Sequence, residues 1–271
     1  MQRRQFSALM GSALGALSFP GAVRAQSTPP RIGVLMLHGK NPGGPQDPSM
    51  APLRTAFEAA GWQVLFPDMP WSRNRYLEGD WDQAMQEIGA HVDTLQRQGS
   101  ERIVLVGHSM GVPASLSFAA RGGTAHALVL LAPGHVPRSY YMVPALKAVR
   151  DSVDEARALV AAGKGDSVER FNDINQGRRI PVVTTARKYL TWFDPESDAD
   201  MGVTAPKVPA TLPVFTAIGE SDPLFKGVRR YFVDQLPANP RSQFVEVGGG
   251  HLDTPAHVRD RLMAWIPAAV A

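Results

Sequence analysis

The chain has 271 residues, of which 44% are hydrophobic and 20% charged, a composition typical of folded rather than disordered proteins. It has no cysteine, which excludes a disulfide framework, thiolate metal ligands and a cysteine nucleophile. The net charge of +3 comes from the first 25 residues, which hold three arginines and no acidic residue; the remainder has 25 basic and 25 acidic side chains. The charge therefore gives no support for a nucleic-acid partner.

The first 25 residues have the pattern of an export signal. The pair Arg3-Arg4 precedes an apolar run over residues 6–19, and Val23-Arg24-Ala25 offers small or compact residues before a cleavage site. The run is too short to span a bilayer, and no cysteine follows it for a lipid anchor. The twin arginine resembles a Tat signal, which exports folded proteins. We expect residues 26–271 to be periplasmic or secreted without stable membrane insertion. The general secretory route and a membrane-anchoring N-terminus are the alternatives.

The remaining chain alternates short apolar runs with helical patterns. Asp80 is placed to cap a helix with Ala84, Ile88 and Val92 on one face, and Thr254 to cap another before Pro255. The apolar runs show little alternation, which favours parallel strands buried on both faces. They cover residues 32–37, 63–66, 102–106, 127–131, 213–218 and 243–247. This order predicts an α/β domain with a mostly parallel central sheet and helices on both faces.

One long segment, residues 137–206, interrupts this alternation. It shows no convincing strand, and a second helix is expected over residues 185–193. A structureless insertion of this length is uncommon, so we predict a helical cap over the sheet. Its first helix has an apolar stripe at three- and four-residue spacing, made of Met142, Leu146, Val149, Val153, Ala156 and Val160. Part of this stripe is expected to line a substrate pocket, and complete packing into the core is the alternative.

The most informative motif is Gly107-His108-Ser109-Met110-Gly111. It follows a predicted buried strand and precedes a helical pattern. A sharp strand-to-helix turn brings the backbone against its neighbours, and only glycine fits on either side of the serine. The turn would hold the Ser109 hydroxyl at a helix N-terminus, where developing negative charge is favoured.

With this motif the chain resembles the α/β-hydrolase superfamily over most of residues 31–271. The family's oxyanion loop falls on His38-Gly39-Lys40, its acid on Asp222 in Gly219-Glu-Ser-Asp-Pro, and its histidine on His251 after Gly249-Gly250. The elements occur in the family's order. The resemblance implies a hydrolase fold with Ser109 as nucleophile, His251 as base and Asp222 as the orienting carboxylate. It assigns the oxyanion donors to the backbone amides of Lys40 and Met110.

The chemistry needs these residue types independently of the family. A serine hydroxyl is a weak nucleophile until an imidazole takes its proton, and a carboxylate fixes the tautomer of that imidazole. Glu220 and Asp253 compete with Asp222 for the last role, and the segment after residues 127–131 offers no carboxylate.

Three further side chains are candidates for substrate binding. Trp71 and Arg73 follow a predicted strand and could hold an anionic or aromatic substrate, and His135 follows another strand. Loop packing is the alternative explanation for all three. Acidic residues alternate over 194–200, but Ala199 and Ala205 stand where a calcium loop needs glycine and glutamate. We expect a solvated acidic loop, no metal and no cofactor.

Together these patterns predict an exported serine hydrolase that cleaves an ester or related acyl bond of a small to medium-sized soluble substrate. Acyl transfer and carbon–carbon bond hydrolysis by the same triad are the catalytic alternatives. A non-catalytic binding protein on the same fold is the alternative from another class.

Overall fold

The core of the molecule is a parallel sheet. The computed structural model describes residues 29–40 and 43–271, so the predicted export signal lies outside the described residues. Six parallel strands form the sheet in the order β2-β1-β3-β4-β7-β8. Their bounds are β1 (Ile32–Leu37), β2 (Gln63–Leu65), β3 (Arg102–Ser109), β4 (Ala127–Pro133), β7 (Val214–Gly219) and β8 (Gln243–Val247). Each coincides with a predicted apolar run, within three residues at either end.

Both faces of the sheet are buried, which explains why the strands show little alternation. Successive side chains of a strand point to opposite faces. Leu35 and Leu105 therefore belong to one apolar cluster, and Val34 and Val104 to another on the far side. Because neither face meets water, selection for polar residues at alternate positions is absent.

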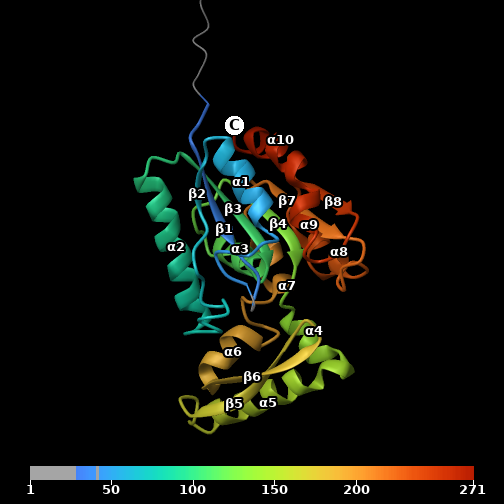
Figure 1. The fold of residues 1–271 in the computed structure, drawn as a ribbon. Helices are drawn as coiled ribbons and strands as arrows, with labels where there is room; N and C mark the ends of the chain where they lie inside the picture. Colours follow the sequence, from blue (N-terminus) through green and yellow to red (C-terminus); the bar gives the residue numbers. More distant parts are fainter. Residues whose placement is uncertain (1–28, 41–42) are drawn as a thin grey trace, which may run out of the picture.

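Helices cover the two faces in pairs. α2 (Trp81–Arg97) and α3 (Gly111–Ala120) pack on one face, and α1 (Ala51–Ala59) and α10 (Arg259–Val270) on the other (Figure 1). Asp80 caps α2 as predicted, because its carboxylate accepts the Gln83 amide at 2.8 Å. The predicted cap at Thr254 is wrong. Thr254 is the first residue of the short helix α9 (Thr254–His257), and its hydroxyl donates to the Gly250 carbonyl at 3.1 Å.

The segment 137–206, called the cap below, lies at the end of the sheet where the parallel strands finish (Figure 1). It is not purely helical, and the prediction of no strand within it is wrong. An antiparallel hairpin lies at its centre, with Phe171 paired to Val182. The remaining elements around it are short. The bounds are α4 (Pro137–Met142), η1 (Pro144–Leu146), α5 (Lys147–Ala161), β5 (Val168–Asn175), β6 (Arg178–Thr185), α6 (Ala186–Phe193), α7 (Met201–Thr204) and η2 (Ala205–Lys207).

The apolar stripe of the cap packs mainly within the cap. Val149, Val153 and Ala156 of α5 are fully buried, and α5 contacts α4, α6 and β5. Met142 is 69% exposed. The structure therefore favours the alternative in which this stripe is core rather than pocket wall.

Two short helices and a connecting segment lie between β7 and β8. They are α8 (Val228–Tyr231), η3 (Val233–Gln235) and the segment that leads into β8. Within residues 29–40 and 43–271, no helix combines the length and apolar character needed to cross a membrane.

Candidate active site

Ser109 ends β3 in a strained backbone conformation. Its φ of 54° lies in the left-handed region, which is costly for a residue with a side chain. The two glycines of the motif are sterically required. A Cβ on Gly107 would lie 2.2 Å from the Gly111 carbonyl oxygen, and one on Gly111 would lie 2.1 Å from the Leu37 carbonyl oxygen. The strand therefore turns directly into α3 and places the half-buried Ser109 at the C-terminal end of the central strand β3.

Two more glycines face the Ser109 side chain from neighbouring strands. Gly39 follows β1, and a Cβ there would lie 3.7 Å from Ser109 Oγ. Gly134 follows β4, and a Cβ there would lie 2.5 Å from the same oxygen. The Gly134 amide also donates to the Ser109 carbonyl at 3.1 Å. The sequence analysis did not single out Gly134, although its place just after a strand of the sheet was visible.

Gly134→Ala is expected to lower kcat/KM by roughly 100-fold, the scale on which an ångström of misplacement acts. The added methyl group would push against Ser109 Oγ. Gly227→Ala is the matched control, because a Cβ there meets nothing nearer than 3.9 Å. Steady-state hydrolysis of a p-nitrophenyl ester measures both variants. Equal activities in the two variants would show that the space beside Ser109 is not needed.

His251 and Asp222 form a close pair. His251 Nδ1 lies 2.6 Å from Asp222 Oδ2, with the histidine side chain 26% exposed and the aspartate buried. Asp222 is held in place because its other oxygen accepts the Leu224 amide at 2.8 Å. A carboxylate can only accept, so Nδ1 carries the proton and Nε2 keeps a free lone pair. That tautomer is the one a general base needs.

The two competing carboxylates lie elsewhere. Glu220 is exposed on the same turn. Asp253 accepts the Gly250 amide at 2.8 Å and shapes the turn that contains His251. Of the three candidate carboxylates, Asp222 is the one that the structure brings to the imidazole.

His108 links the strand-to-helix turn at residues 107–111, called the elbow below, to the loop that carries His251. Its Nε2 donates to the His251 carbonyl at 3.0 Å, and the two rings lie 5.2 Å apart. Burial, and secondarily the neighbouring His251, lower the pKa of His108 to about 4, so its imidazole is neutral at neutral pH. The contact holds the loop that carries His251 against the residue that precedes Ser109, although His108 and His251 are 143 positions apart in the sequence.

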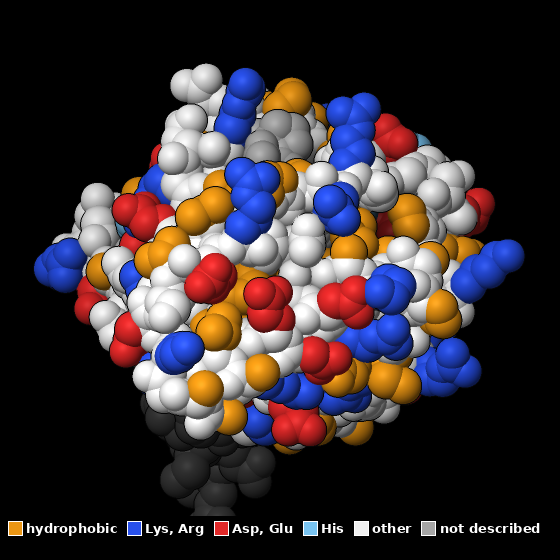
Figure 2. Space-filling model, turned by 90° about the horizontal axis from the view of Figure 1, so that it is seen from below, with side chains coloured by type: hydrophobic (Ala, Val, Ile, Leu, Met, Phe, Trp, Pro, Cys, Tyr) orange, Lys and Arg blue, Asp and Glu red, His pale blue; other side chains and the backbone are white. Residues whose placement is uncertain are grey.

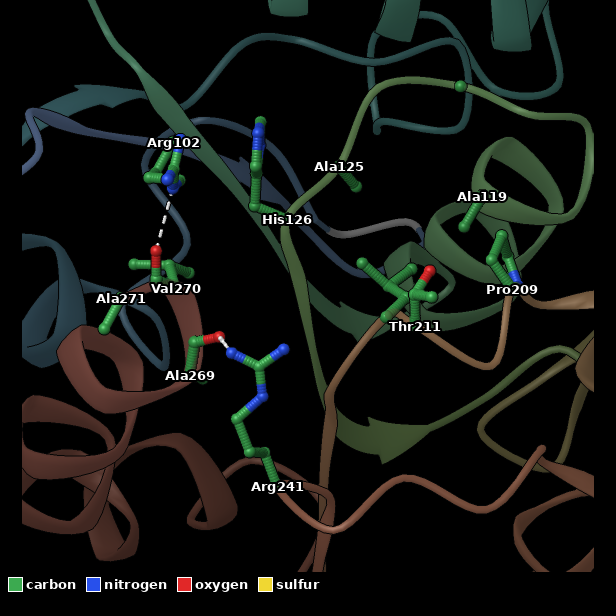
Figure 3. Close-up of a pocket in the computed structure, with 12 residues that line it drawn as sticks. Arg102, Ala119, Ala125, His126, Pro209, Thr211, Arg241, Ala269, Val270 and Ala271 are labelled. Atoms are coloured by element: carbon green, nitrogen blue, oxygen red, sulfur yellow. Dashed lines mark hydrogen bonds between the residues drawn. The ribbon is translucent and has the colours of Figure 1, made fainter.

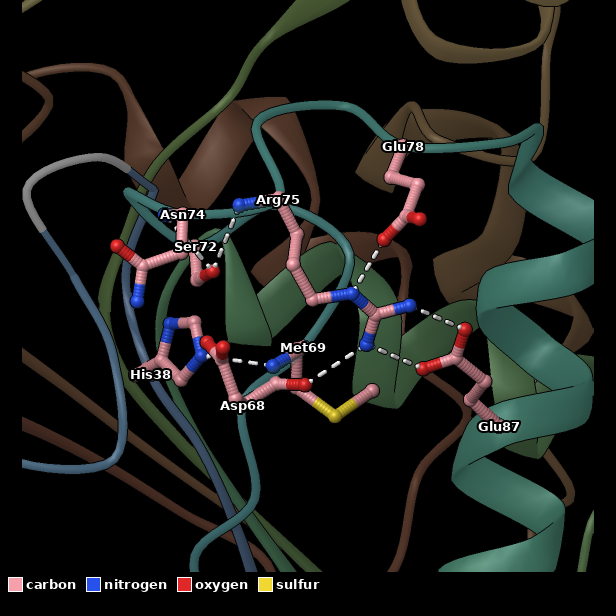
Figure 4. A network of polar contacts seen from close by, with 8 residues as sticks. All are labelled: His38, Asp68, Met69, Ser72, Asn74, Arg75, Glu78 and Glu87. Carbon is pink, nitrogen blue, oxygen red and sulfur yellow. Dashed lines mark hydrogen bonds and ion pairs between the residues drawn. The ribbon is translucent and has the colours of Figure 1, made fainter.

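The loop after β1 is fixed by His38. The Met69 amide donates to His38 Nε2 at 3.1 Å (Figure 4). Nδ1 therefore carries the proton and donates to the Gly39 carbonyl at 2.7 Å. The Trp71 indole donates to the His38 carbonyl at 2.8 Å. His38 thus has a structural role, and it sets the direction of Gly39 and Lys40.

Arg75 holds the neighbouring loop, residues 67–80. Arg75 binds both oxygens of Glu87 on α2 at 2.8 Å and donates to the Asp68 carbonyl at 2.9 Å (Figure 4). It also pairs with Glu78. The loop that carries Met69 and Trp71 is therefore tied to α2, and through Met69 it supports His38.

Two of the three predicted substrate-binding residues are buried, which corrects that prediction. Trp71 is 0% exposed, and the His38 carbonyl takes its indole N–H. His135 is 4% exposed, and its Nε2 donates to the Trp192 carbonyl at 2.7 Å. Loop packing, the alternative explanation, accounts for both. Arg73 is exposed on the same loop.

The acidic residues of the cap have structural partners. Both oxygens of Asp194 bind Arg157, at 2.8 and 2.9 Å. Asp198 pairs with Arg121, and Asp200 accepts the amides of Arg138 and Gly202. Among the described residues, no group of three or more histidines and acidic residues is arranged to hold a metal ion.

A cavity of about 430 Å³ lies away from Ser109 (Figure 3). Arg102 and Arg241 line it and donate to the carbonyls of Val270 and Ala269, each at 2.8 Å. Carbonyls at a helix C-terminus lack intrahelical partners, so these arginines cap α10. The cavity lies toward the start of β3, at the opposite end of the sheet from the elbow.

The parallel sheet, the elbow and the histidine–aspartate pair define an α/β hydrolase. The chain belongs to the alpha/beta hydrolase family, whose model matches residues 34–263. No curated protein sequence matches the chain.

Solved structures share the fold at low sequence identity. The monoacylglycerol lipase of Paleococcus ferrophilus is 18% identical over 89% of this chain and 96% of its own, with a TM-score of 0.61. A thermostable carboxyl esterase from Bacillus coagulans is 15% identical over 90% and 92%, with a TM-score of 0.60. A putative hydrolase from Agrobacterium vitis S4 is 19% identical over 89% and 88%, with a TM-score of 0.60.

The buried imidazoles predict acid sensitivity. Burial, more than the nearby Lys40, lowers the pKa of His135 to about 3, and burial lowers that of His108 to about 4. As pH falls below about 6.5, the unfolded chain binds protons that the folded chain does not, so stability is lost. Each imidazole contributes up to about 1.4 kcal/mol per pH unit down to its folded pKa. Urea unfolding between pH 7.5 and pH 4 measures the slope. A constant free energy of unfolding over that range would contradict the assignment.

Proposed function

We propose that this chain is an exported serine hydrolase that cleaves an ester or related acyl bond through an acyl-enzyme intermediate. The observation that supports it most is the hydrogen bond of 2.6 Å between Asp222 and His251, on a loop that His108 joins to the strained Ser109 elbow. A strained backbone at a candidate nucleophile, beside a base in the correct tautomer, is the arrangement that acyl transfer requires.

The first half of the reaction forms the acyl-enzyme. Ser109 Oγ attacks the substrate carbonyl carbon while His251 Nε2 takes the hydroxyl proton, and Asp222 stabilises the resulting imidazolium. The carbonyl oxygen becomes negative and accepts hydrogen bonds from the backbone N–H groups of Lys40 and Met110. The carbon–oxygen bond to the leaving alcohol then breaks, and His251 gives the alcohol its proton.

The second half releases the acid. A water molecule loses its proton to His251 and attacks the acyl carbon, and the bond to Ser109 Oγ breaks as the serine recovers the proton. No step needs a cofactor. The same amides stabilise the second oxyanion.

The surface of the cap supports a preference for small or medium-sized soluble acyl substrates over lipid aggregates. Seen from the cap end, acidic and basic side chains are interspersed, and apolar side chains are scattered between them (Figure 2). The exposed large apolar residues of the cap are Met142, Val143, Val168 and Val183. A surface that binds lipid aggregates needs a broad continuous apolar patch.

A graded panel of p-nitrophenyl esters tests the substrate class. We expect kcat/KM to be highest for short and medium acyl chains in solution and to fall for long chains supplied as emulsions. Activity that rises sharply when an emulsion forms would contradict the proposed class. No hydrolysis of any ester, with an otherwise folded protein, would favour the binding-protein alternative.

Export is a separate prediction. A variant in which both Arg3 and Arg4 are changed to lysine should stay in the cytoplasm as the precursor, because the Tat route recognises the arginine pair. Cell fractionation and the size of the accumulated protein measure it. Normal processing of the lysine variant would contradict Tat export and favour the general secretory route.

A further inference from the structure

A buried charged cluster joins the cap to the loop after β1. Lys40 Nζ lies 2.7 and 2.9 Å from the two carboxylate oxygens of Asp173 on β5. The two side chains are 4% and 0% exposed. The Tyr76 hydroxyl donates to the same carboxylate. The ammonium also lies 3.4 Å from His135 Nδ1.

Proton positions in this cluster follow from its partners. His135 Nε2–H donates a hydrogen bond to the Trp192 carbonyl, so Nδ1 is an acceptor and faces the ammonium. Burial, and then Asp173, raise the pKa of Tyr76, so its hydroxyl stays protonated and donates. The three N–H groups of Lys40 are thus accounted for by the two Asp173 oxygens and His135, and the ammonium is not free to bind a substrate.

The cluster brings together residues from the segments that follow three strands of the sheet. Lys40 follows β1, Tyr76 lies in the loop after β2, and His135 follows β4. The rings of Tyr140 on α4 and Phe193 on α6 lie 5.8 and 5.7 Å from the ammonium. Asp173 therefore joins the hairpin of the cap to the C-terminal ends of the strands, where Ser109 also lies.

Such a pair is a poor way to gain stability alone. Taking two charges out of water costs much of what their attraction returns, and well-packed apolar residues often stabilise a fold as well or better. The pair instead defines the position of Lys40. Hydrogen bonds are directional, so an ion pair with four close polar contacts restricts the position of Lys40 more than apolar packing would. Lys40 directly follows Gly39, which packs against Ser109.

We propose that Lys40 and Asp173 are positioning residues that hold the backbone amide of Lys40 in the oxyanion hole and make its alignment depend on a seated cap. This inference rests on the proposed function. The lysine side chain acts through its own backbone, and Asp173 acts through the lysine. The cap thereby contributes to catalysis without a side chain that touches the substrate.

Three variants test the proposal. Lys40→Met and Asp173→Asn each break the pair, and Lys40→Met combined with Asp173→Leu replaces it with apolar side chains. The double variant guards against misfolding, because it leaves no unpaired buried charge. Arg157→Met is the control, since it removes another ion pair of the cap, with Asp194, in which neither Lys40 nor Asp173 takes part.

With p-nitrophenyl butyrate we expect kcat to fall about 10- to 100-fold in all three variants, with KM changed less than about 3-fold, because a misaligned donor acts on the transition state. The double variant should keep a wild-type melting temperature and the low kcat. Hydrogen exchange at residues 38–40 and 168–175 should quicken together. The control should keep wild-type kcat.

A double variant with wild-type kcat would overturn the proposal and leave the pair a purely structural contact. A low kcat with unchanged exchange at residues 38–40 would also overturn it. If the wild-type protein neither hydrolyses the ester nor reacts with a fluorophosphonate, the proposed function itself fails, and this inference falls with it.

Discussion

Ser109→Ala is expected to lower kcat by at least about 10⁴-fold while the melting temperature stays near that of the wild type. The change removes one hydroxyl from a half-buried side chain and leaves both elbow glycines in place. Both serine and alanine have a Cβ, so the φ of 54° is unfavourable for either residue. Steady-state hydrolysis and thermal unfolding measure the two effects.

The loss should not add to that of His251→Ala. Serine and histidine act on the same proton, so the double variant should be about as inactive as either single variant. Ser117→Ala serves as the control for a serine-to-alanine change in the same region, because Ser117 lies on α3 and its hydroxyl accepts the Trp81 indole N–H. Substantial activity in Ser109→Ala would contradict the mechanism.

Asp222→Asn is expected to lower kcat by roughly 10⁴-fold, because an amide in place of the carboxylate favours the wrong imidazole tautomer. Glu220→Gln is the matched control: it makes the same change of charge on the same turn, on a side chain exposed to solvent. It should keep wild-type activity.

The pair of variants also decides between the two carboxylates. If Glu220→Gln is the damaging change and Asp222→Asn is not, the orienting carboxylate is assigned wrongly. Measuring kcat from pH 5 to pH 9 separates a lost base from a lost fold, because an unfolded variant is inactive at every pH.

Much of the sheet could be predicted because parallel strands buried on both faces leave a clear apolar signal. The predicted runs match β1 and β8 residue for residue, and β3 begins at the predicted residue but continues three residues further, to Ser109. The elbow was equally legible, because its glycines answer a local steric demand that does not depend on distant residues.

The hairpin of the cap was not predicted, because a buried charged residue interrupts its apolar pattern. Phe171 and Val182 face inward on β5 and β6, but the next inward position of β5 holds the buried Asp173, which breaks the apolar alternation. The turn Gln176-Gly177, with φ of 50° and 74°, was the one available local signal. A charged residue at an inward position contradicts the local pattern, and such conflicts concentrate at functional or strained sites.

The contacts of the site itself depend on residues far apart in sequence. Arg75 with Glu87, Lys40 with Asp173 and His108 with the His251 carbonyl each join segments that only the folded chain brings together. Sequence patterns gave the residue types of the candidate site, and the fold decided between Asp222 and its competitors.

The most direct test of the proposed mechanism is the reaction of the mature protein with a fluorophosphonate, followed by mass spectrometry of its peptides. We predict one covalent adduct per chain, on the peptide that contains Ser109, and none in Ser109→Ala. An unlabelled wild-type protein, or an adduct on a different residue that persists in Ser109→Ala, would contradict the account.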